Sequence, residues 1–151
     1  MIRNTLVALL VAGSVAFHAA AQTKEQKLYQ AVSQNDTLVA RQLLRDKASP
    51  DYVMAVGPWM KVNPLITAVN KGNTAMVKLL LAYKANVNWR DGFQTSALMY
   101  AASQGSKELV LLLLANGADV KASDRQGNTV LSAAKESKNK EVIDLVEAKL
   151  K

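Results

Sequence analysis

The hydrophobic positions of this chain recur in blocks with a period of 33 residues. The segment NPLITA at 63–68 matches SALMYA at 96–101 and TVLSAA at 129–134. Further along each block, a second apolar stripe has three- and four-residue spacing, which is typical of one face of a helix. The pattern therefore predicts two short helices in each block, stacked side by side into one continuous array.

Polar and small residues mark where the helices of each block begin and end. Asn63, Ser96 and Thr129 come directly before the first helices, and such side chains accept hydrogen bonds from the free N–H groups at a helix start. Gly72 and Gly105 follow the first helices, where a left-handed residue is needed to end them. Each block is thus predicted to form a helix, a tight turn and a second helix.

A weaker copy of the block precedes the three clear ones, at an offset of 37 residues. In this copy Asn35 replaces the turn glycine, and Asn is the next-best residue for left-handed backbone. The offset is four residues longer than the period, so residues 50–62 should form an enlarged finger between repeats. In the last block Glu147 replaces the leucine of earlier blocks, which predicts a polar outward face at the end of the stack.

The recurring segments resemble the ankyrin-repeat family. NPLITA, SALMYA and TVLSAA stand for its TPLHxAA signature, and YKANV and NGADV for its GADxN ending. The resemblance covers roughly residues 24–151 and implies an all-α solenoid of about four helix–turn–helix units with short β-hairpin fingers. The repeats are expected at about 24–57, 58–90, 91–123 and 124–151. The family's His after Pro-Leu is replaced by Ile66, Met99 and Ser132, so we expect an inter-repeat hydrogen bond to be lost and stability to be modest.

Residues 1–21 have the pattern of a cleavable secretory signal peptide. Arg3 precedes a largely apolar run at 6–17, and three alanines at 19–21 supply the small residues that signal peptidase recognises. The alternative is a membrane anchor, but 12 helical residues span only about 18 Å of a ~30 Å hydrocarbon core. We therefore expect residues 22–151 to form a domain released into a bacterial periplasm, without stable membrane insertion.

The few reactive side chains of the chain argue against catalysis. There is no Cys, and the single His, His18, lies in the predicted leader. The mature chain therefore lacks the groups for Ser-His-Asp or Cys-His catalysis and the usual zinc ligands, and it has no glycine-rich phosphate loop. We expect no enzyme, no cofactor and no metal site. Asp91 and Asp124 recur at equivalent positions, where the resemblance implies that they hold hairpin turns together.

The ankyrin resemblance also implies where a partner protein would bind, because the family uses its fingertips and the exposed faces of its first helices. Aromatic and arginine side chains at such tips are the usual anchors of interfaces. We expect Trp59 or Trp89 either to serve in this way or to fold back over the core. Transferred by position, the predicted partner-binding residues are Trp59, Met60, Lys71, Arg90, Phe93, Gln104 and Arg125.

The distribution of charge along the chain indicates which kind of partner surface we expect. Without Arg3 the chain has 18 basic and 12 acidic residues, a net charge of +6, and no Asp or Glu occurs between Tyr52 and Arg90. This basic segment favours either an acidic partner protein or a solvated face that aids solubility. A second possible function is binding of an anionic envelope polymer or lipid surface, which salt would weaken steeply. Nucleic acid is not expected, since no recognition helix or stacking platform is evident, and we expect a monomer.

Overall fold

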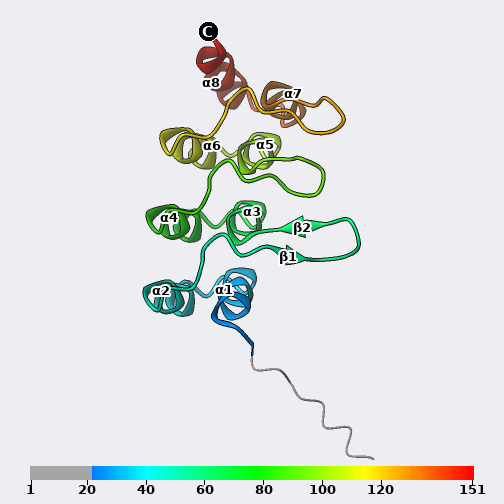
Figure 1. The fold of residues 1–151 in the computed structure, drawn as a ribbon. Coiled ribbons are helices and arrows are strands. Elements are labelled where there is room, and N and C mark those ends of the chain that lie inside the picture. The colour runs from blue at the N-terminus through cyan, green and yellow to red at the C-terminus, as the bar shows by residue number, and fades with distance from the viewer. Residues whose placement is uncertain (1–21) are drawn as a thin grey trace, which may run out of the picture.

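The computed structural model describes residues 22–151, and this part of the chain folds into a stack of four helix pairs (Figure 1). The predicted all-α solenoid is confirmed, whereas the predicted leader, residues 1–21, lies outside the described residues. In each pair the first, inner helix lies next to the fingers and the second, outer helix lies away from them. The helices are α1 (Lys24–Ser33), α2 (Thr37–Arg45), α3 (Pro64–Asn70), α4 (Thr74–Ala82), α5 (Ala97–Ser103), α6 (Lys107–Ala115), α7 (Val130–Glu136) and α8 (Lys140–Leu150).

The predicted capping residues form the helix boundaries. The side chains of Asn63, Ser96 and Thr129 accept hydrogen bonds from the N–H groups three residues later, at the starts of α3, α5 and α7. Gly72 and Gly105 take left-handed conformations with φ of 65° and 67° after α3 and α5. Because every inner helix has seven or ten residues and ends in such a turn, the outer helix folds back directly beside it.

Small residues let the helices of the stack pack closely. Ala68, Ala101 and Ala134 are fully buried at equivalent positions of α3, α5 and α7. Each inner helix packs against its own outer helix and against the inner helices above and below, so one hydrophobic core runs through all four pairs. No helix among residues 22–151 is both long and apolar enough to cross a membrane.

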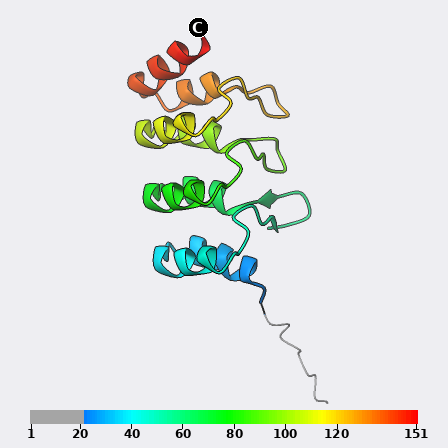
Figure 2. The same cartoon turned by 60° about the vertical axis from the view of Figure 1, so that its left-hand side comes forward.

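Three loops project from the same side of the stack (Figure 2), and we name them finger A (residues 50–62), finger B (86–95) and finger C (119–128). Finger A is the enlarged finger that the four-residue insertion predicted, and it forms a hairpin of β1 (Met54–Ala55) and β2 (Lys61–Val62). Fingers B and C are shorter, and each is closed by a single antiparallel bridge at its base.

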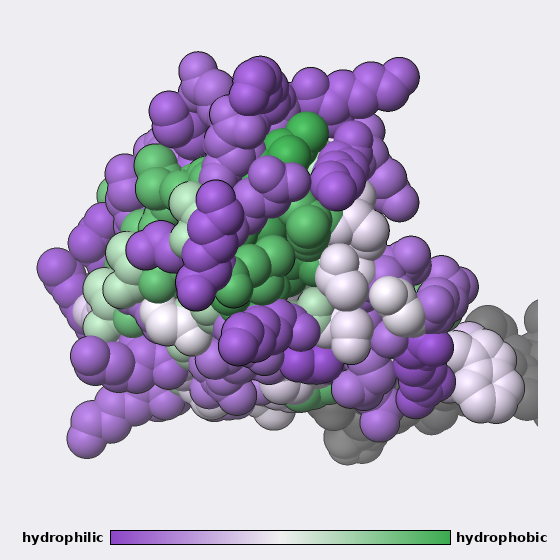
Figure 3. Space-filling view, turned by 90° about the horizontal axis from the view of Figure 1, so that it is seen from above, coloured by the Kyte–Doolittle hydropathy of each residue, from purple (hydrophilic) through white to green (hydrophobic). Residues whose placement is uncertain are grey.

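The C-terminal end of the stack is polar only in part. Lys135 and Glu147 are exposed on α7 and α8 and form an ion pair of 4.0 Å. Leu131 and Ile143, however, are only half-buried, although their counterparts in the preceding repeats are fully buried. Figure 3 looks onto this end and shows hydrophobic surface inside a hydrophilic rim. The predicted polar outward face is therefore confirmed at Glu147. It is wrong at Leu131 and Ile143, which leave apolar surface exposed at this end.

Candidate functional site

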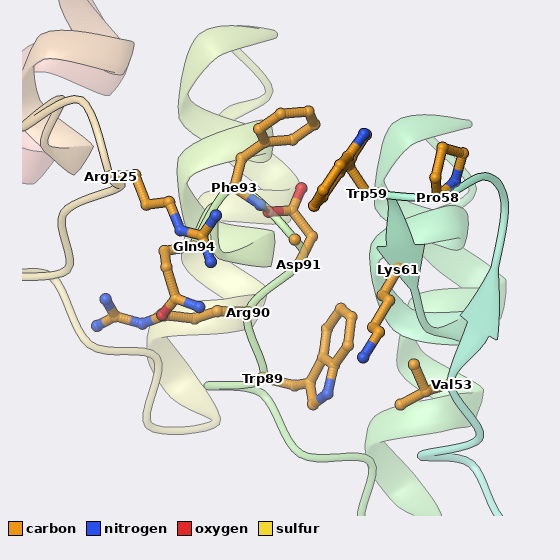
Figure 4. A pocket seen from close by; sticks show the side chains of 11 residues that line it. Val53, Pro58, Trp59, Lys61, Trp89, Arg90, Asp91, Phe93, Gln94 and Arg125 are labelled. Atoms are coloured by element: carbon orange, nitrogen blue, oxygen red, sulfur yellow. Dashed lines mark hydrogen bonds between the residues drawn. The ribbon is translucent and has the colours of Figure 1, made fainter.

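A groove of about 870 Å³ lies between fingers A and B, with finger C at its edge (Figure 4). This volume is in the range, about 300–1,000 Å³, of clefts that enclose a bound ligand. The groove is lined mainly by aromatic and basic side chains. These are Trp59 and Lys61 of finger A, Trp89, Arg90 and Phe93 of finger B, and Arg125 of finger C.

The backbones of the three fingers meet at the groove and set its shape. A Cβ atom built on Gly92 would overlap the carbonyl oxygen of Trp59, so only glycine permits fingers A and B to approach so closely. On the other side, the backbone N–H of Arg125 donates a hydrogen bond of 3.1 Å to the carbonyl oxygen of Phe93. The fingers therefore form one connected surface instead of three independent loops.

Asp91 organises finger B from inside. Its Oδ1 accepts hydrogen bonds from the N–H groups of Phe93 (2.8 Å) and Thr95 (2.9 Å), and its Oδ2 accepts one from the Tyr100 hydroxyl at 2.7 Å. Burial of the phenol, reinforced by this hydrogen bond, raises the pKa of Tyr100. Asp91 is only 3% exposed and both of its carboxylate oxygens accept hydrogen bonds, so it has the turn-forming role that the sequence predicted.

Asp124 repeats this arrangement in finger C. Its Oδ1 accepts hydrogen bonds from the N–H groups of Gln126 (2.8 Å) and Asn128 (2.9 Å). The side-chain amide of Asn128 donates to its Oδ2, and this hydrogen bond lowers the pKa of Asp124. Neither aspartate has the free, paired geometry of a general acid or base.

The basic side chains around the groove differ in how their charge is used. Arg90 donates from Nη1 to the carbonyl oxygen of Ser123 at 2.9 Å, and its Nη2 lies 3.6 Å from Oδ2 of Asp119. It is therefore a strut between fingers B and C. Lys61 and Arg125 are exposed, and their side chains form no hydrogen bond or ion pair with any other residue in 22–151.

The structure brings four of the seven predicted binding residues together at this groove: Trp59, Arg90, Phe93 and Arg125. Met60 is exposed next to Trp59 in finger A. Lys71 and Gln104, in contrast, cap the C-terminal ends of α3 and α5. These caps are separated from the finger bases by the length of a seven-residue helix, about 10 Å. The predicted set therefore divides into a fingertip cluster and two isolated residues.

The two tryptophans have different environments. Trp59 is 83% exposed, so it does not fold back over the core. Trp89 is half-buried and packs against the core while one side lines the groove. The alternative of a core-covering tryptophan thus holds for Trp89 alone. Lys61 was not among the seven predicted binding residues, because the depth of the groove depends on how the enlarged finger folds.

A set of hydrogen bonds between repeats was also not expected from the sequence. Oδ1 of Asp51 accepts from the N–H of Asn86 at 2.7 Å, and Oδ1 of Asn88 accepts from the N–H of Asp119 at 2.8 Å. Asp51 and Asn88 are equivalent in the repeat, which is the sequence signal that could have identified them. These bonds link successive finger bases, so the absence of the family's His does not leave the repeats without polar links.

The described residues contain no group of three or more His, Asp or Glu side chains that could hold a metal ion.

A family model described as ankyrin repeats in three copies matches residues 28–124 and, in a second register, residues 65–149. No individual curated protein matches the chain significantly. Since the family match covers nearly all of the described repeats, the chain belongs to the ankyrin-repeat family, whose members are generally protein-binding scaffolds and typically not catalysts.

Proposed function

We propose that this protein is a non-catalytic module that binds a partner protein through the groove between fingers A and B, in the bacterial periplasm. The observation that carries the proposal is the exposure of two large aromatic side chains at the groove, with Trp59 83% and Phe93 46% exposed. Exposing such surface to water is unfavourable, and aromatic side chains in this setting are typical anchors of interfaces. The periplasmic location rests on the leader pattern of residues 1–21.

The way the fingers are held also supports binding. The Asp91 turn, the Arg90 strut and the contact between Gly92 and Trp59 fix the groove before any partner arrives. A surface that is already ordered loses less conformational entropy on binding, which raises affinity. Rigidity at exposed loops is therefore consistent with a site for recognition.

The distribution of charge favours a localised site over a broad anionic polymer or lipid surface. On the outer helices, Lys78 pairs with Glu108 at 3.3 Å and Lys107 pairs with Glu141 at 2.9 Å. These pairs neutralise two of the basic side chains on that side of the stack. The unpaired charges of Lys61 and Arg125 remain at the groove, where they would attract an acidic partner surface.

The proposal is tested by retaining a partner from periplasmic extract on the immobilised protein and identifying it by mass spectrometry. We expect one abundant protein to be retained, and Trp59→Ala and Phe93→Ala each to reduce its retention by about tenfold or more, as for interface hot spots. Leu111→Ala is the matched control, because Leu111 is 44% exposed but lies on the outer helix α6. Equal retention by all of these variants would contradict the proposed site.

The export part of the proposal needs a separate measurement. After expression of the full chain, cell fractionation and N-terminal sequencing should find a periplasmic protein that begins at Gln22. An uncleaved chain in the cytoplasm would contradict periplasmic export but would leave the proposed binding groove intact.

A further inference from the structure

We infer that the groove between fingers A and B recognises an acidic segment of the partner protein, in which Asp or Glu lies next to a large apolar side chain. The inference rests on the proposed function and specifies its ligand. It follows from two kinds of side chain that share the groove: the exposed aromatics Trp59 and Phe93, and the unpaired cations Lys61 and Arg125.

The aromatic part of the groove defines the apolar half of the ligand. In Figure 4 the rings of Trp59 and Phe93 lie next to each other at one end, with Asp91 between their stems. The backbone contact between Gly92 and Trp59 holds the two fingers at this spacing. An apolar side chain placed against both rings would bury surface that is now exposed to water, which is the main source of binding free energy at such sites.

The basic part of the groove defines the acidic half of the ligand. Lys61 and Arg125 lie on opposite sides of Asp91 in Figure 4, one from finger A and one from finger C. Arg90 is already engaged by Ser123 and Asp119. The carboxylate of Asp91 is engaged by two backbone N–H groups and the Tyr100 hydroxyl.

Asp91 is buried and Arg90 is paired, so the exposed, unpaired charges at the groove are those of Lys61 and Arg125, and both are positive. A carboxylate that enters between them would gain charge-assisted hydrogen bonds without displacing an internal partner. Finger A supplies no competing acid at the groove, because residues 53–89 contain no Asp or Glu and Asp51 accepts a hydrogen bond from the N–H of Asn86 instead of lining the groove. A groove with exposed cations beside exposed aromatic rings thus matches a ligand in which a carboxylate lies next to an apolar group.

The test is a selection of random peptides displayed on phage against the purified protein, which needs no knowledge of the natural partner. We expect the selected peptides to be enriched in Asp or Glu adjacent to Leu, Phe or Trp. One selected peptide is then synthesised together with a version in which Asn and Gln replace its acids. The acid-free version should bind about tenfold more weakly, because it loses the charge-assisted bonds.

Charge reversal on the protein provides the second arm. Lys61→Glu and Arg125→Glu should each weaken binding of the selected peptide by about tenfold, and a peptide with Lys in place of its acid should recover binding to these variants. Arg41→Glu on the outer helix α2 is the matched control and should bind as the wild type does, since Arg41 is exposed and far from the fingers. Circular dichroism of each variant verifies that the stack is folded.

Peptides without enrichment of acids, no groove-dependent peptide, or equal affinity of the reversed variants would each overturn the inference. Binding of phosphatidylglycerol vesicles that is lost in Lys61→Glu and Arg125→Glu would overturn the assignment to a protein segment. If a partner is retained through Trp59 and Phe93 but is insensitive to both charge reversals, the inference fails while the proposed function stands.

Discussion

The side chain of Asn63 has one group that stabilises the fold and one that destabilises it. Its Oδ1 accepts a hydrogen bond of 2.9 Å from the N–H of Ile66 and so caps α3, as the sequence predicts. Its Nδ2, however, is fully buried and has no hydrogen-bond partner. Ser96 and Thr129 cap the equivalent helices with a hydroxyl and carry no such amide. The capping role could be predicted from sequence, but the unpaired donor could not, because it depends on which groups the folded chain places around the amide.

Asn63→Thr should therefore raise the free energy of unfolding by about 1 kcal/mol, since it keeps the cap and removes a buried donor without an acceptor. Urea unfolding followed by circular dichroism measures the change. Ser96→Ala is the control and should lower the free energy of unfolding by about 1 kcal/mol, because it removes a helix cap and does not remove a buried unpaired donor. Destabilisation by Asn63→Thr would mean that the amide of Asn63 finds a partner in solution.

Tyr100 connects a residue of α5 to the turn of finger B. Its hydroxyl donates to Asp91, and burial followed by this hydrogen bond raises its pKa above the ordinary value of about 10. The folded state therefore holds the phenolic proton more tightly than the unfolded state. The resulting stabilisation is fully present below about pH 10 and is lost progressively as the pH rises further.

We expect the free energy of unfolding to fall as the pH is raised above about 10, and part of this fall to be absent in Tyr100→Phe. Urea unfolding at a series of alkaline pH values measures both. The phenylalanine variant will also be less stable at neutral pH, because Asp91 loses one of its three hydrogen bonds, so the slope with pH is the relevant comparison. Identical slopes in both proteins would show that the Tyr100 proton does not contribute.

At the scale of the elements, the fingers depart most from the repeat. Fingers B and C are built alike around Asp91 and Asp124, whereas Pro58 stands at the equivalent position of finger A. Finger A lacks that internal carboxylate and relies on its β-hairpin and on the contact of Trp59 with Gly92. The helices could be predicted because their signals recur, but the groove could not, since the insertion and this contact have no counterpart in other repeats.

Gly92→Ala should separate fingers A and B while the helices remain folded, because its Cβ would overlap the backbone of Trp59 and not a side chain that can move. We expect binding at the groove to weaken by about tenfold or more, with tryptophan fluorescence altered and helical circular dichroism retained. Gly127→Ala in finger C is the control: it is strained by a φ of 84°, but its Cβ would meet no atom within 4 Å. The control should lose some stability and keep its binding.

At the scale of the whole molecule, burial follows the period of the stack and shows which positions face each end. Leu131 and Ile143 are half-buried, whereas the equivalent Leu98 and Val110 are fully buried under a following repeat. At the other end Val39 is 46% exposed, although the residues equivalent to it in later repeats are fully buried. Both ends therefore keep part of the apolar surface through which repeats stack.

Polar residues interrupt these two apolar ends. Lys135 stands where earlier repeats have Val69 and Ala102, and Glu147 stands where they have Leu81 and Leu114. At the N-terminal end, exposed Lys27 occupies the position of the buried Pro64. A copy of the chain that stacked on either end would have to desolvate these charges, which opposes association. The arrangement explains why a monomer remains our expectation.

Replacing Lys135 by Val and Glu147 by Leu should make the C-terminal end like that of an internal repeat and allow head-to-tail association with the N-terminal end of another copy. We expect the wild type to sediment as a monomer and the double variant to show a mass that increases with concentration in analytical ultracentrifugation. Lys78→Val with Glu108→Leu is the matched control, since it removes an ion pair from the outer helices and leaves both ends unchanged. Association in the control as well would indicate nonspecific hydrophobic association. A monomeric Lys135→Val, Glu147→Leu variant would show that these two charges are not what prevents the ends from associating.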